Sequence, residues 1–312
     1  MSRPRHLPVV AVLAAAVALA GCGSGHDPAG AAGVTGDVRV VASFYPLQWT
    51  AEQVVGEEAD VVSLTKPGAE PHDLELAPQD VATLADADLV VYLKGFQPAV
   101  DDAVQQEGGD DAFDVTRAAD LDLTYTSIED GQQESDEAGA VDPHFWLDPV
   151  RLATVADALA ARLGRLHPEN ATRYETNSAA LRVELEALDA AFEAGLADCA
   201  NTNLVTSHNS FGYLARRYGL TQVGITGLTP EDEPKPGDLA DITTFVEDNA
   251  VETIYYETLV SPAVARTVAA ETGARTAVLD PIEGLTDESE GADYLQVMRA
   301  NLANIRTGQP CS

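Results

Sequence analysis

The stretch Asp37-Val38-Arg39-Val40-Val41-Ala42-Ser43-Phe44-Tyr45-Pro46 sets the pattern of the chain, because an apolar run leads into a proline that can open a helix. The run is apolar at most positions rather than at alternate ones, which is typical of a parallel strand covered on both faces. Similar runs follow at 59–64, 88–93 and 112–116, with helical stretches between several of them. The first half therefore predicts a parallel sheet of about four strands flanked by helices.

The second half of the chain repeats this alternation. Its predicted strands lie at 203–207, 221–225, 251–256 and 274–279. Between the halves, residues 149–197 include an apolar pattern of helical spacing over about 28 residues, enough for one helix of roughly 40 Å. We therefore predict an α/β protein with two similar lobes, at 37–148 and 198–312, bridged by one long α-helix.

The first residues have the features of a processing signal. A short basic region precedes an apolar stretch at 9–20 that is too short for a comfortable membrane span. The stretch ends in Leu19-Ala20-Gly21-Cys22, which resembles a lipobox and implies cleavage before Cys22 and a lipid on its sulfur. We predict a signal peptide at 1–21 and a flexible tether at 22–36. The alternative is an ordinary secretory signal with a chance cysteine.

The composition is strongly acidic, with 51 Asp and Glu against 18 Lys and Arg and a formal net charge of −33. This charge excludes nucleic-acid binding by the usual electrostatic route. An acidic surface attracts cations, but by itself it identifies no site.

The chain contains three cysteines. If Cys22 carries a lipid, Cys199 and Cys311 remain as a pair in an oxidising compartment. We therefore expect a disulfide between Cys199 and Cys311, which would tie the end of the chain to the start of the second lobe.

Three of the six histidines lie near predicted strand ends or proline-marked turns. His72 follows the second predicted strand by a short loop, His144 lies just past the last predicted elements of the first lobe, and His208 directly follows a strand of the second lobe. Glu257 and Asp280 also come directly after strands of the second lobe. Ligands of open parallel sheets bind beyond the carboxyl ends of the strands. We therefore expect these side chains to meet in a cleft between the lobes.

Three imidazoles and one carboxylate form a ligand set that suits a divalent metal, zinc above all. We choose Asp280 as the fourth ligand, because a short carboxylate at a strand end before a proline would be held rigidly. Glu257 is the alternative, either as a ligand or as an acceptor for an imidazole N–H. Taken singly, a strand-end histidine is more often a surface residue and a strand-end acid is commonly a helix N-cap. The joint placement of the candidates favours a metal site.

Five motifs occur in a fixed order along the chain. They are Ala42-Ser43-Phe44-Tyr45-Pro46, Pro67-Gly68-Ala69-Glu70-Pro71-His72, Asp142-Pro143-His144-Phe145-Trp146-Leu147-Asp148-Pro149, Ser207-His208-Asn209-Ser210-Phe211-Gly212-Tyr213-Leu214 and Met298-Arg299-Ala300-Asn301-Leu302. Together they resemble the metal-binding solute-binding lipoproteins of bacterial zinc and manganese ABC importers, over essentially everything from Asp37 onward. The resemblance implies two lobes bridged by one long helix, and maps the metal ligands to His72, His144, His208 and Asp280. A histidine at the third position resembles the zinc branch, since manganese binders tend to carry an acid there.

The resemblance implies an extracytoplasmic, lipid-anchored receptor that captures Zn²⁺ and delivers it to a membrane permease driven by a cytoplasmic ATPase. We expect a monomer with no enzymatic activity and no catalytic residues, attached to the membrane through the lipid on Cys22. A manganese-specific binding protein of the same family is the first alternative. A zinc hydrolase is less favoured, because it would need an open metal position and a general base. An adhesin, with metal serving only structure, is a third possibility.

Two departures from the family pattern concern the surroundings of the metal. Many zinc members carry a histidine-rich loop before the second ligand, whereas the corresponding stretch here, 129–139, is acidic and lacks histidine. A metal-collecting role for this loop would have to rest on weak carboxylate contacts. Some members place a glutamate directly before the first histidine, but Pro71 holds that position here, so no ligand role is transferred to Glu70.

Overall fold

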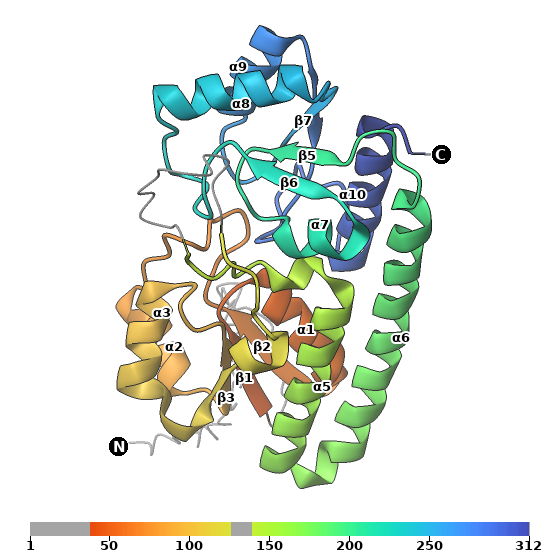
Figure 1. Ribbon diagram of the computed structural model, residues 1–312. Coiled ribbons are helices and arrows are strands. Elements are labelled where there is room, and N and C mark those ends of the chain that lie inside the picture. Colours follow the sequence, from red (N-terminus) through yellow and green to blue (C-terminus); the bar gives the residue numbers. More distant parts are fainter. Residues whose placement is uncertain (1–37, 126–138, 312) are drawn as a thin grey trace, which may run out of the picture. The chain divides into compact units, whose positions relative to one another are not determined.

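The computed structural model describes residues 38–125 and 139–311, which belong to one compact unit, Val34–Ser312 (Figure 1). The predicted signal peptide, the tether with Cys22, and the acidic loop up to residue 138 lie outside the described residues. Within the described part of the chain, no helix combines the length and the apolar character needed to cross a membrane.

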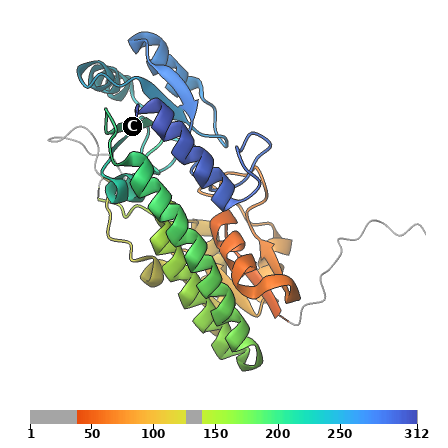
Figure 2. The ribbon, with the colours of Figure 1, turned by 90° about the vertical axis from the view of Figure 1, so that its right-hand side faces the viewer.

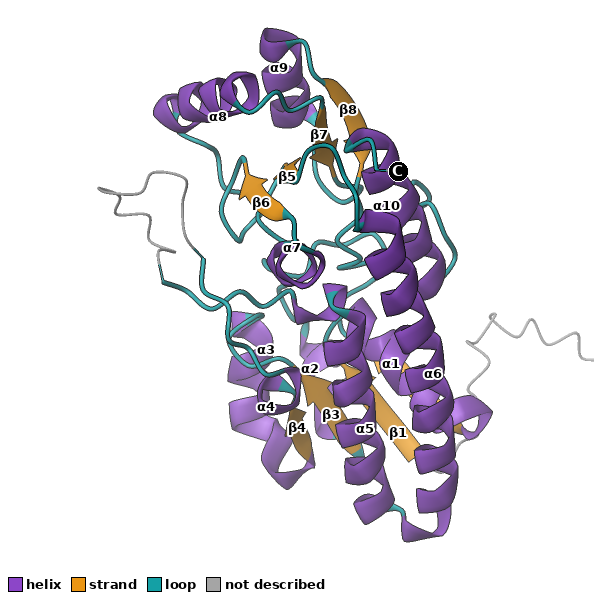
Figure 3. Cartoon of the chain, turned by 45° about the vertical axis from the view of Figure 1, so that its right-hand side comes forward, coloured by secondary structure: helices purple, strands orange, loops and turns teal. Residues whose placement is uncertain are grey.

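Eight strands of the described residues form two parallel sheets of four strands each (Figure 3). The first sheet has the order β2-β1-β3-β4. Its strands are β1 (Val38–Ala42), β2 (Ala59–Ser63), β3 (Leu89–Tyr92) and β4 (Ala112–Asp114). The helices of this lobe are α1 (Tyr45–Val55), α2 (Pro78–Ala85), α3 (Pro98–Ala103) and α4 (Thr116–Ala119).

The position of β1 inside the first sheet explains why its sequence is apolar at most positions rather than at alternate positions. Val40 and Ala42 pack into the main core, whereas Val41 packs into a second core, and none of the three has exposed surface. Both faces of the sheet are thus covered, as expected for a parallel sheet.

The second sheet repeats the order of the first, as β6-β5-β7-β8. Its strands are β5 (Asn203–Thr206), β6 (Thr221–Gly224), β7 (Thr253–Tyr256) and β8 (Arg275–Val278). The helices of this lobe are α7 (Gly212–Tyr218), α8 (Pro236–Asp248), α9 (Ala263–Thr272) and α10 (Tyr294–Gly308). The structure therefore confirms two similar α/β lobes.

Two antiparallel helices connect the lobes, α5 (Pro149–Leu166) and α6 (Ala171–Leu196). Asp148 caps α5, because its side chain accepts hydrogen bonds from the backbone N–H groups of Val150 and Arg151. The 26 residues of α6 span about 39 Å at the usual rise per residue. Along this length α6 packs against α1 of the first lobe and α10 of the second (Figure 2). It is the predicted bridging helix.

One hydrophobic core extends through the facing sides of both lobes. It includes Phe44 and Trp146 from the first lobe, Phe192 from α6, and Tyr213 and Tyr294 from the second lobe. The outer face of the second sheet has a separate core, under α8 and α9. The two lobes are therefore joined by packed side chains as well as by α6.

A disulfide joins Cys199, which precedes β5, to Cys311, which follows α10. The two residues also form an isolated antiparallel bridge. The end of the chain is thus attached to the beginning of the second lobe.

Candidate metal centre

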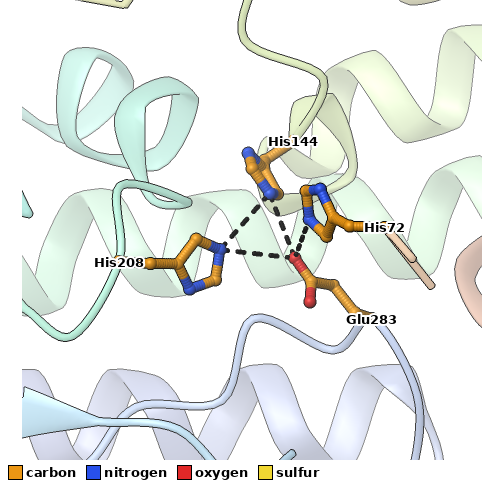
Figure 4. A group of neighbouring side chains, drawn as sticks. All are labelled: His72, His144, His208 and Glu283. Carbon is orange, nitrogen blue, oxygen red and sulfur yellow. Dashed lines mark hydrogen bonds and ion pairs between the residues drawn. The ribbon is translucent and has the colours of Figure 1, made fainter. Parts of the chain in front are cut away.

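Four side chains from separate parts of the sequence meet where the two lobes face each other, and they point toward one another (Figure 4). His72 lies in the loop between β2 and α2, and His144 lies just before the helical turn Phe145–Leu147 that leads into α5. His208 follows β5, and Glu283 lies in the loop between β8 and α10. The structure thus brings together all three predicted histidines.

The Oε1 atom of Glu283 is the point on which the three rings converge. It lies 3.3, 3.0 and 3.4 Å from the Nε2 atoms of His72, His144 and His208, respectively. The Nε2 atoms of His144 and His208 are 3.5 Å apart. All four candidate ligand atoms lie within 4.8 Å of one another.

Two of the imidazoles have a carboxylate beside their Nδ1 atom. Asp142 Oδ1 lies 2.8 Å from His144 Nδ1 and also accepts the backbone N–H of His144. Glu257 Oε1 lies 2.7 Å from His208 Nδ1. With Nδ1 engaged in this way, each ring presents Nε2 to the group, an arrangement typical of histidines that bind metals.

The group is almost fully buried, and its charges depend on one another. Burial lowers the pKa of His72. Burial acts in the same direction on His144 and His208, but their hydrogen bonds and charge interactions with carboxylates outweigh it and raise the pKa of both rings. For Glu283, burial acts to raise the pKa, whereas its charge interaction with His72 and the hydrogen bonds of the three rings hold it well below its usual range. The carboxylate is therefore anionic at neutral pH.

The donor set fits zinc in chemistry and in spacing. Around a tetrahedral zinc with bonds of about 2.0–2.1 Å, neighbouring ligand atoms lie about 3.3–3.4 Å apart. The measured Glu283 to imidazole distances of 3.0–3.4 Å are close to this spacing. The Oε2 atom of Glu283 is buried without a hydrogen-bond partner among the described residues, which is costly for a carboxylate unless a cation is nearby.

Asp280, predicted to be the fourth ligand, lies outside this group, and Glu283 occupies the expected place. Asp280 Oδ1 accepts the backbone N–H of Ile282 at 2.8 Å. Its Oδ2 accepts hydrogen bonds from Ser289 Oγ at 2.8 Å and Thr258 Oγ1 at 3.2 Å. The Asp280 carboxylate therefore stabilises the turn that leads to Glu283 instead of facing the rings.

Glu283 was not among the predicted ligands because it does not directly follow a strand. Glu283 stands in the same loop as Asp280, three residues further on, and glycine follows it. Ile282, directly before it, has φ of 59°, a left-handed conformation that is unusual for a β-branched residue. That backbone turn lies immediately before the carboxylate that faces the rings.

Glu257 lies beside His208 Nδ1, the position expected of an acceptor for an imidazole N–H. Glu70 Oε1 lies 3.9 Å from His72 Nε2, farther than the Glu283 oxygen. Burial raises the pKa of Glu70 to about 8.

The fold and the site together define a two-lobed protein with a candidate site for a divalent metal between its lobes. Residues 40–308 match the family model described as "Zinc-uptake complex component A periplasmic". The chain therefore belongs to this family of zinc-uptake components.

Individual relatives agree with the family match. The chain is 35% identical over 296 residues to "High-affinity zinc uptake system protein ZnuA" of Bacillus subtilis (strain 168), with 92% of each chain covered. It is also 35% identical over 287 residues to "Zinc-binding protein AdcA" of Streptococcus pyogenes serotype M1. That match covers 87% of this chain but 56% of AdcA, so the chain spans about half the length of this relative.

A solved structure of similar fold contains zinc. The Zn(II)-bound ZnuA-like domain of Streptococcus pneumoniae AdcA matches with a TM-score of 0.72 and 33% sequence identity. The match covers 88% of this chain and 99% of that domain. The similarity thus extends over nearly all of the two-lobed fold.

Proposed function

We propose that this protein captures Zn²⁺ outside the cytoplasm and delivers it to the permease of an ABC importer, which a cytoplasmic ATPase drives. The observation that carries the proposal is the convergence of three imidazole Nε2 atoms on Glu283 Oε1 at 3.0–3.4 Å. Membership of a family of zinc-uptake components supports it. Zinc is the cargo of such a receptor.

The proposed ligands are His72, His144, His208 and Glu283. Asp280 is not among them, because its carboxylate oxygens are engaged in the turn before Glu283. Three nitrogen ligands favour zinc over manganese, which prefers oxygen ligands. This ligand set therefore argues against the manganese-specific alternative.

The same arrangement argues against a zinc hydrolase. Four protein ligands would fill a tetrahedral zinc and leave no position for an attacking water. Glu257, the general base considered for a hydrolase, is already in contact through Oε1 with His208 Nδ1 and Ser207 Oγ. We therefore propose that the protein has no catalytic activity.

The remaining parts of the proposal concern attachment and release. We propose that a lipid on Cys22 anchors a monomeric protein to the outer face of the cell membrane, a role that the lipobox-like sequence supports. A closed site with four ligands holds its cargo tightly, so delivery requires the permease to bind a form with misaligned ligands better than the closed form.

Metal-competition calorimetry on a soluble chain lacking residues 1–36 tests the proposal. We expect zinc to bind with a Kd below about 1 μM, and this binding to be strongly weakened by Glu283→Ala but little changed by Glu288→Ala, which removes an exposed carboxylate of the same loop. Tighter binding of manganese than of zinc would contradict the proposed cargo. Zinc binding that survives replacement of all three histidines by alanine would contradict the proposed site.

A further inference from the structure

Glu283 follows the last strand of the second lobe, yet its loop is fastened to the residues that carry His144. Trp146, two residues after His144, donates its Nε1–H to the backbone oxygen of Pro281 at 2.7 Å. The hydroxyl of Tyr294, at the start of α10, donates to the backbone oxygen of Trp146. One residue therefore holds the Glu283 loop at both of its ends.

The start of α10 is also attached to the first lobe directly. The ring of Tyr294 stacks on the ring of Trp49 in α1, with centroids 4.8 Å apart. Tyr294 and Trp146 have no exposed surface, and Trp49 is nearly buried. The segment from Pro281 to Tyr294 thus has buried contacts with the first lobe at its beginning and at its end.

Trp146 belongs to an aromatic platform, formed by Phe44, Phe96 and Trp146. The Trp146 ring lies 4.9 Å from Phe44 and 5.7 Å from Phe96, measured between centroids. The platform also supports two of the ligands, because Trp146 lies 5.2 Å from the His144 ring and Phe96 lies 4.6 Å from the His72 ring. His72, His144 and the Glu283 loop therefore share one packed support.

His208 is held differently, by residues of the second sheet. Its Nδ1 lies 2.7 Å from Glu257 Oε1, just beyond β7. Its backbone oxygen accepts hydrogen bonds from Thr206 Oγ1 in β5 and Gln222 Nε2 in β6. The position of this ligand thus follows the second sheet.

We propose that Trp146 is a positioning residue for the metal, which fixes Glu283 relative to His144 so that three ligands form one group on the aromatic platform. His208 is then the single ligand whose position depends on the second sheet. This inference rests on the proposed zinc site. It differs from the division suggested by chain order, in which each lobe would contribute two ligands.

A double-mutant cycle on the full chain tests the inference, using Trp146→Phe, Glu283→Ala and the combined variant. Phenylalanine keeps an aromatic ring but cannot donate to Pro281, so the Glu283 loop loses its buried hydrogen bond. We expect Trp146→Phe to raise the zinc Kd about tenfold when Glu283 is present, as typical for residues that orient metal ligands. In the Glu283→Ala background, the same change should alter the Kd less than about twofold, because the two effects are coupled.

A control variant separates positioning from general loss of packing. Tyr218→Phe also removes a hydrogen bond of a nearly buried ring, in this case to Asp189, away from the metal ligands. It should leave the zinc Kd unchanged. The visible spectrum of bound Co²⁺ should change in Trp146→Phe and not in Tyr218→Phe, because it reports the ligand geometry directly.

Other results would overturn the inference. If Trp146→Phe raises the Kd equally in both backgrounds, or leaves it unchanged, Trp146 does not act through Glu283. If Glu283→Ala alone leaves zinc binding intact, the proposed ligand set fails first, and the inference fails with it. If circular dichroism shows that Trp146→Phe does not fold, Tyr294→Phe takes its place in the cycle and is judged by the same two comparisons, since it removes the other hydrogen bond to Trp146.

Discussion

The two lobes have sheets of the same strand order, but they surround their buried histidines differently. His144 and His208 each have Nδ1 beside a carboxylate and Nε2 beside Glu283. His144, however, lies against the ring of Trp146 in the main core, whereas His208 is surrounded by the ends of β5, β6 and β7. Equal topology therefore does not mean that the two lobes play equal mechanical roles.

The cores, by contrast, do not distinguish the two lobes. The main core includes Leu204 and Tyr255 of the second sheet as well as Val40 and Ala42 of the first. The outer side of each sheet has its own smaller core, with α8 and α9 in the second lobe and with α2 and α3 in the first. The difference between the lobes therefore lies in the contacts around the histidines.

Removal of ligands should have the largest effect on zinc affinity and should sharpen this comparison. We expect both His144→Ala and His208→Ala to raise the zinc Kd more than about 100-fold. Loss of a residue that only orients a ligand already lowers metal affinity about 10–100-fold. The loss should be greater for His144→Ala, since His208→Ala leaves three ligands on one support. Competition against a zinc chelator measures both.

His167→Ala is the matched control, because His167 lies at the far end of α5 and should not affect zinc binding. A larger loss for His208→Ala than for His144→Ala would show that the three other ligands do not form a group.

Removal of the carboxylates that contact the Nδ1 atoms of His144 and His208 should have an intermediate effect on zinc affinity. We expect Asp142→Ala and Glu257→Ala each to raise the zinc Kd about 10–100-fold, because the imidazole loses the partner that orients it and increases its basicity. Calorimetric zinc titration measures the change. Glu252→Ala, which removes an exposed carboxylate just before β7, is the control and should leave the Kd unaltered. Unchanged affinity in Glu257→Ala would mean that the second sheet does not position His208 through this contact.

Removal of the disulfide should affect zinc affinity least. The double variant Cys199→Ala with Cys311→Ala should lose about 2–5 kcal/mol of unfolding free energy, because the bridge closes a long loop. The zinc Kd should change less than about twofold, since the bridge is separate from the ligand contacts. Denaturant unfolding and zinc competition on the same protein measure the two quantities. A large loss of affinity would show that the site depends on this outer end of the second lobe.

The sequence by itself determined the elements of the fold and three of the four residues that meet at the site. Burial on both faces produces apolar runs such as Val38–Ala42, and helical spacing marks α6, so each can be found from a short window. The histidines were found because His208 directly follows a strand and because His72 and His144 lie in motifs with a characteristic order. Glu257 was placed among the site residues because it, too, directly follows a strand.

The tertiary structure alone decided which acid faces the histidines. Asp280 and Glu283 are three residues apart, and no local pattern distinguishes a carboxylate that stabilises a turn from one that faces a metal. The choice depends on the path of the backbone through Ile282. That path is fixed by hydrogen bonds from distant residues, since Asn301 holds both backbone groups of Asp280 and Trp146 holds the oxygen of Pro281. The contacts of Asn301 need the second lobe to be folded, and the contact of Trp146 forms only when both lobes have folded.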